Sequence, residues 1–135
     1  MKTFVADSNY HQFYVADRIA EPDAPVEWTE DDVAAHHVTL SNISALSPES
    51  DIDARITSCG PNDEPMEFSD PIDYEVRVTI ECPSRSVGIY GWPWELEDEY
   101  EIGTTSCDIL FRAFLTAFKD EEKDYYYVHV TPKDG

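Results

Sequence analysis

Hydrophobic and polar residues alternate along much of the chain, a period of two that is typical of β-strands with one buried face. The clearest example is segment 74–82, where Tyr, Val, Val, Ile and Cys alternate with Glu, Arg, Thr and Glu. Such segments are short and are separated by turns rich in proline, glycine and acidic residues. About eight strands are predicted, at residues 9–16, 38–46, 52–57, 74–82, 87–90, 94–102, 108–118 and 125–130.

Segment 108–118 is the most hydrophobic part of the chain, and both of its faces are apolar in an extended conformation. A strand of this kind belongs at the centre of a layered structure. The same residues also form one stripe at helical spacing, so periodicity alone leaves helix and strand open. We favour the strand because the tyrosine-rich run 125–130 follows after a short charged spacer, as in a β-hairpin.

One short helix is predicted over 28–36, with Thr29 as N-cap and three acidic residues in its first turn. Strands at short, turn-marked spacing with a single helix indicate a mainly β fold. We therefore predict one domain, residues 1–135, folded as an antiparallel β-sandwich of about eight strands with one short helix.

Charge is the strongest compositional signal: 29 acidic residues stand against 9 basic ones, and the formal net charge is −20. Direct binding to nucleic acid is disfavoured, because it needs Lys and Arg to neutralise phosphates. Insertion into a membrane is not expected either, since no segment is long and apolar enough. The charge indicates a basic protein partner. Adaptation to high internal salt is an alternative explanation for the same excess.

Catalysis and cofactor binding find no support in the sequence. It contains no glycine-rich phosphate loop, no His-Glu-x-x-His and no Gly-x-Ser-x-Gly, so we predict a protein that is not an enzyme. The three cysteines are widely spaced and are expected to be buried thiols in a reducing, cytoplasmic setting. No metal site is predicted, although acidic loops at Asp51–Asp53, Asp63–Glu64 and Asp120–Glu122 keep a calcium-binding or other ligand-binding module as the alternative function.

An acidic row in segment 94–102 is the candidate partner-binding site. Alternation places its glutamates on one outer face, at spacings of roughly 7 Å, where like charges repel. A solvated edge that blocks strand pairing is the simpler interpretation, and binding to a basic partner is the functional one. The candidate residues are Glu95, Glu97, Asp98, Glu99 and Glu101.

A family resemblance rests on Tyr-His-Gln-Phe at 10–13, on Glu-Trp-Thr at 27–29 before the acidic helix, and on segment 74–80. In these features the chain resembles the competence protein J family, small acidic bacterial inhibitors of a DNA-entry nuclease. The signature residues are Tyr10, His11, Gln12, Phe13 and Trp28. The resemblance implies a cytoplasmic protein without catalysis or cofactor, which binds a nuclease and suppresses it. We expect the signature to pack the first strand against the helix, although Tyr and Trp also serve as interface anchors.

Overall fold

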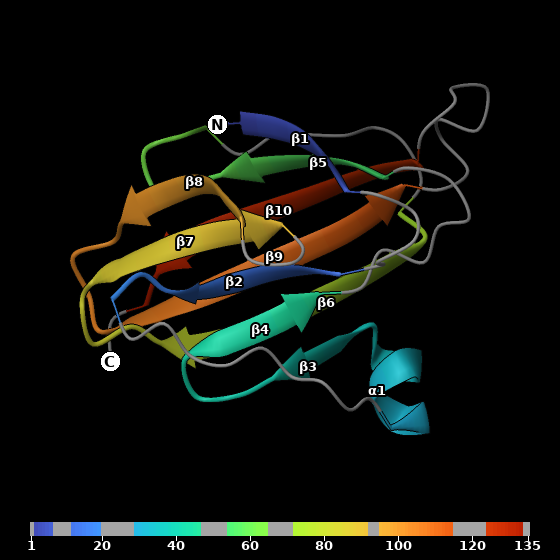
Figure 1. The fold of residues 1–135 in the computed structure, drawn as a ribbon, viewed down its shortest axis with the longest axis horizontal. Helices are drawn as coiled ribbons and strands as arrows, with labels where there is room; N and C mark the ends of the chain where they lie inside the picture. Colours follow the sequence, from blue (N-terminus) through green and yellow to red (C-terminus); the bar gives the residue numbers. More distant parts are fainter. Residues whose placement is uncertain are drawn as a thin grey trace.

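The computed structural model describes residues 2–6, 12–19, 29–46, 54–64, 72–91, 95–114 and 124–133. These residues form two five-stranded sheets and one short helix (Figure 1). Sheet A contains, in spatial order, β1 (Lys2–Ala6), β5 (Ala54–Cys59), β10 (Asp124–Pro132), β9 (Ser106–Phe114) and β6 (Tyr74–Glu81). Sheet B contains β3 (His37–Thr39), β4 (Ile43–Leu46), β2 (Phe13–Asp17), β7 (Ser86–Gly91) and β8 (Glu95–Glu101). The predicted β-sandwich is confirmed.

The hairpin of β9 and β10 forms the middle of sheet A, as the two-sided hydrophobicity of segment 108–118 predicted. The strands pair antiparallel, with Val128 opposite Phe111 and Val130 opposite Ile109. β10 also pairs with β5 in parallel orientation, while the other pairs in both sheets are antiparallel. The helical alternative for this segment is therefore wrong over its described part, up to Phe114.

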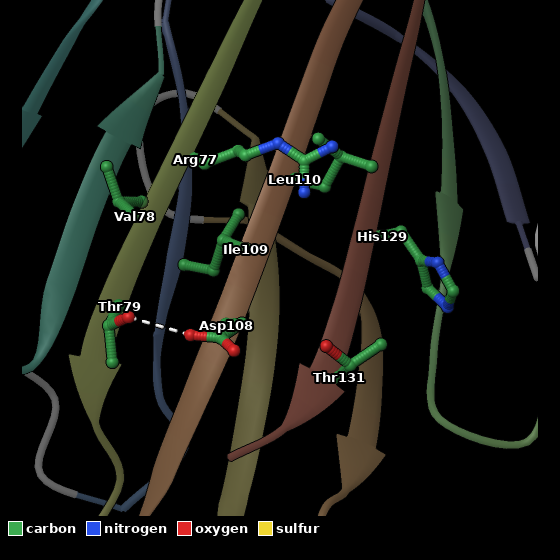
Figure 2. A pocket seen from close by; sticks show the side chains of 8 residues that line it. All are labelled: Arg77, Val78, Thr79, Asp108, Ile109, Leu110, His129 and Thr131. Carbon is green, nitrogen blue, oxygen red and sulfur yellow. Dashed lines mark hydrogen bonds between the residues drawn. The ribbon is translucent and has the colours of Figure 1, made fainter.

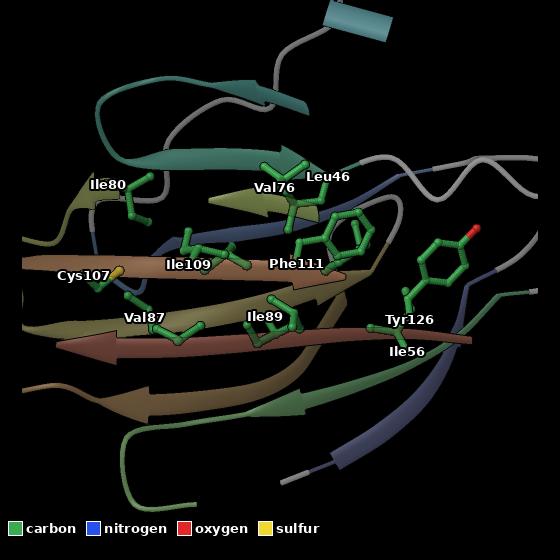
Figure 3. Close-up of a cluster of buried hydrophobic side chains, with 14 of the residues drawn as sticks. Leu46, Ile56, Val76, Ile80, Val87, Ile89, Cys107, Ile109, Phe111 and Tyr126 are labelled. Carbon is green, nitrogen blue, oxygen red and sulfur yellow. The ribbon is translucent and has the colours of Figure 1, made fainter. Parts of the chain in front are cut away.

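The sandwich interior lies between the sheets and contains the inward side chains of both (Figure 3). Phe111 is at its centre, with ring centroids 5.4 Å from Phe13 of sheet B and 5.7 Å from Tyr126 of the neighbouring strand. Cys82 and Cys107 are buried in this interior and Cys59 on the far side of sheet A, and all three are free. The expected burial of the cysteines is thus confirmed.

The helix α1 (Glu30–Ala35) begins where the N-cap predicted. The Asp32 amide donates to Thr29 Oγ1 at 3.1 Å, and the Thr29 amide donates to Asp32 Oδ2 at 2.9 Å. This reciprocal pair satisfies two amides that have no partner within the helix. No helix in the described part of the chain has the length and hydrophobicity needed to cross a membrane.

One strand prediction needs correction, one strand was missed, and one can be checked only in part. Segment 38–46 is two strands, β3 and β4, because the chain turns at Ser41 and Asn42 and pairs back on itself. The N-terminal strand β1 was not predicted, because five residues are too few for a clear alternation. The strand predicted at 9–16 is observed from Phe13, and its first residues lie outside the described part.

Candidate partner-binding edge

Strand β8 carries the acidic row, and it is one of the two edge strands of sheet B, where it pairs with β7. It lies on the same side of the sandwich as β1, one of the two edge strands of sheet A (Figure 1). An edge strand exposes backbone amides and carbonyls that would otherwise pair, so its side chains decide what can approach. The predicted site therefore occupies a border of the sandwich rather than the middle of a sheet.

A β-bulge interrupts the row, which corrects the expectation that four glutamates stand in line on one face. Tyr90 pairs with Leu96 whereas the preceding Ile89 pairs with Asp98, so Glu97 is the extra residue. An extra residue reverses the alternation of side chains beyond it. As a result Leu96, which strict alternation with the outward glutamates would place inward, is 38% exposed.

Glu97 is held by a cation of the same chain. Its Oε2 lies 3.3 Å from Lys2 Nζ on β1, and its side chain is only 19% exposed. The pair links β1, at one edge of sheet A, to β8, at one edge of sheet B. Glu97 is therefore less available to a partner than its position in the sequence predicted.

Asp98 accepts two hydrogen bonds from residues of its own strand. One carboxylate oxygen accepts the amide of Glu99 at 2.9 Å, and the other accepts the hydroxyl of Tyr100 at 2.8 Å. The Tyr100 hydroxyl also lies 2.9 Å from Ser58 Oγ on β5. A Cβ on Gly60 would lie 2.2 Å from the Tyr100 ring, so glycine is required for this contact between the sheets. The geometry gives Asp98 a structural role that the sequence did not reveal.

Glu99 is exposed but also has a cationic neighbour. Arg18 Nε donates to Glu99 Oε2 at 2.8 Å, and this hydrogen bond raises the pKa of the Arg18 guanidinium. Glu95 and Glu101 are exposed and make no ion pair with any described residue. The carboxylates best placed to meet an external cation are therefore those of Glu95 and Glu101, followed by Glu99.

The signature residues can be placed only in part, because Tyr10, His11 and Trp28 lie outside the described residues. Phe13 is fully buried in the interior, where its ring meets Phe4 and Phe111 edge to face. Gln12 Oε1 accepts the hydroxyl of Tyr14 at 2.9 Å. Phe13 thus packs against strands β1 and β9, whereas the expected packing against the helix stays a prediction. The place of Phe13 and Gln12 in a contact surface stays a prediction.

The adjacent histidines His36 and His37 have separate surroundings. The ring of His36 stacks on Tyr74 with centroids 3.7 Å apart, whereas His37 Nδ1 lies 2.8 Å from Thr39 Oγ1. Burial lowers the pKa of His37. Among the described residues no three His, Cys, Asp or Glu side chains gather in a way that could hold a metal ion. Of the acidic loops weighed for calcium, Asp63–Glu64 lies within the described part.

A pocket of about 410 Å³ lies on the face of sheet A that is turned away from sheet B (Figure 2). Its side chains come from β6, β9 and β10, three strands that are neighbours in the sheet. Sequence analysis missed it, because residues far apart in the chain form it. The only signal was the regular alternation of segment 74–82, which places Arg77 and Thr79 together on a solvent-exposed face.

Comparison with known proteins identifies the class of fold. Neither a protein-family model nor a curated protein sequence matches this chain. Among solved structures it is similar to ComJ from Bacillus subtilis, described as an inhibitor of the DNA degrading activity of NucA. The TM-score is 0.75 at 14% sequence identity, over 98% of this chain and 96% of ComJ. A second similar structure, described as crocagin biosynthetic gene J, gives a TM-score of 0.58 at 11% identity, over 98% and 96% of the two chains.

At this level of identity the likeness establishes the fold. The acidic sandwich is a protein of ComJ-like fold, and the resemblance predicted from the signature residues is confirmed in that respect.

Proposed function

We propose that this protein is a nuclease inhibitor that binds a DNA-degrading enzyme and suppresses it without catalysis of its own. The observation that carries the proposal is the likeness to ComJ, an inhibitor of a DNA degrading activity, over almost the whole length of both chains. The net charge of −20 supports it independently. A nuclease that binds DNA has a basic groove, and an anionic protein competes with the DNA phosphates for that groove.

In this proposal the edge strand β8 covers the basic DNA-binding face of the nuclease. Glu95 and Glu101 supply carboxylates without ion-pair partners among the described residues, and Glu99 exchanges Arg18 for a cation of the partner. Asp98 and Glu97 hold the strand in place from within the protein. The three free cysteines fit a reducing, cytoplasmic setting.

The first test is inhibition of the nuclease encoded nearest to the gene for this chain, measured as DNA degradation with and without the purified protein. Complementary charge steers association, so the association rate should fall steeply as salt rises from about 50 to about 500 mM and the Debye length shrinks from roughly 14 to roughly 4 Å. Absence of any binding to that nuclease would contradict the proposed function.

A matched pair of variants tests the surface. Glu95→Gln/Glu101→Gln should slow association and flatten the salt dependence. The control Glu30→Gln/Asp31→Asn removes the same charge from the exposed first turn of α1. If the two double variants slow association equally, the net charge of the chain and not the β8 edge determines the rate.

A further inference from the structure

The pocket on sheet A is a second candidate site, and its chemistry differs from that of the β8 edge. Figure 2 shows the Arg77 side chain reaching from β6 across β9 toward Leu110. At the other end Thr79 Oγ1 donates to Asp108 Oδ1 at 2.7 Å, and Thr131 lies on the adjacent strand β10. His129 turns toward β5, where its Nε2 lies 3.2 Å from the Gly60 carbonyl oxygen. Arg77, Leu110, Asp108 and Thr131 thus surround the open space.

Cations are concentrated on this outer face of sheet A. Among the described residues its charged side chains are Arg55, Arg77, Arg112 and Lys133, together with Asp73, Glu75, Glu81 and Asp108. Cations and carboxylates are thus equal in number here, in a chain whose net charge is −20. Such a face is suited to an anion that the rest of the molecule would repel.

Polar groups in and beside the pocket have hydrogen-bond donors or acceptors that no described residue occupies. The Arg77 side chain is 69% exposed, and its only ion pair with a described residue is through Nε to Glu75. The end of its guanidinium lies beside Leu110 (Figure 2), and its Nη groups carry further hydrogen-bond donors. The Lys133 ammonium lies 4.0 Å from Asp108 Oδ1 and 3.5 Å from Thr79 Oγ1. Within the described part of the chain, the Thr131 hydroxyl and Asp108 Oδ2 make no hydrogen bond.

We propose that this pocket binds a small organic anion that also carries hydroxyl groups. Arg77 holds its carboxylate or phosphate, since guanidinium matches the geometry of both oxyanions. Asp108 Oδ2 accepts a hydrogen bond from a ligand hydroxyl, and Leu110 contacts its carbon chain. A volume of about 410 Å³ leaves room for such a molecule. The site is separate from the β8 edge, so this inference stands without the proposed nuclease inhibition.

Two probes test the proposal on the full chain: D-glycerate, a hydroxylated carboxylate, and glycerol 3-phosphate, a hydroxylated phosphate ester. Backbone amide NMR signals of Arg77, Leu110 and Thr131 should shift and saturate with a Kd below about 1 mM for at least one probe. Saturation by one of them identifies the oxyanion, and saturation by both shows that the site accepts either. Glycerol, and sodium chloride at the same ionic strength, should give no saturable shift.

The variant Arg77→Gln should weaken probe binding about tenfold or more, because it removes a charge-assisted hydrogen bond. Its matched control is Arg112→Gln, since Arg112 pairs with the same Glu75 but does not line the pocket. Arg77 is an exposed position, so Arg77→Gln should keep the wild-type fold. Failure of both probes to saturate, equal binding of glycerol, or equal weakening by Arg77→Gln and Arg112→Gln would each overturn the proposal.

Discussion

Charged side chains are arranged differently on two exposed surfaces of the sandwich, the β8 edge and the outer face of sheet A. On β8 a bulge reverses the alternation, and the carboxylates are divided between partners inside the protein and solvent. On sheet A the alternation of β6 continues without interruption, and cations of separate strands meet on one face. Like charges that are close together in the sequence therefore do not necessarily form one charged surface. Register decides which of its members face the same way.

Side chains of sheet A that pack between the two sheets should contribute far more to the free energy of unfolding than those of the β8 edge. Phe111→Ala should lower the free energy of unfolding by about 3–5 kcal/mol, because it leaves a cavity between the two sheets. Leu96→Ala, at the partly exposed edge, should cost less than about 1 kcal/mol. Chemical denaturation measures both. Equal costs would show that the edge is as tightly packed as the interior.

Because Tyr14 of sheet B is buried, the free energy of unfolding should fall at alkaline pH. Burial raises the pKa of Tyr14 to about 12, above about 10 in the unfolded chain. The neutral hydroxyl therefore contributes stability that is complete below about pH 10 and is lost as pH rises toward about 12, by about 2–3 kcal/mol. Tyr14→Phe should remove this part of the slope when unfolding free energy is measured against pH. A variant with the wild-type slope would contradict the prediction.

The two hydrogen bonds that Asp98 accepts should be measurable as stability. Asp98→Ala removes the acceptors of the Glu99 amide and the Tyr100 hydroxyl, so it should cost about 1–2 kcal/mol. Glu101→Ala on the same strand is the control and should change stability by less than about 0.5 kcal/mol. If Asp98→Ala is equally neutral, Asp98 is free to act as a contact residue, as the sequence predicted.

The ion pair between Lys2 and Glu97 should have the smallest effect, because Lys2 is 47% exposed. A double-mutant cycle with Lys2→Met and Glu97→Gln should give a coupling free energy below about 1 kcal/mol, smaller still at high salt. A coupling well above that value would mean that this pair is a main connection between the two edge strands.

The fold class and the central strands could be predicted from local patterns in the sequence. Alternation in segment 74–82 predicted β6 and its solvent-exposed face. The hydrophobicity of both faces of segment 108–118 predicted a strand in the middle of a sheet. The N-cap and acidic first turn predicted α1 almost to the residue. These features are local, since side-chain period and capping depend on neighbours in the chain.

Local patterns could not predict which charged side chains meet. The bulge opposite Ile89 and Tyr90 is a property of two paired strands, so no pattern within β8 reveals it. Lys2 reaches Glu97 across the boundary between the two sheets, and Arg77, Asp108 and Thr131 meet because β6, β9 and β10 are adjacent. Each contact joins residues far apart in sequence. Its existence therefore depends on strand order and register, which the alternation of a single strand does not encode.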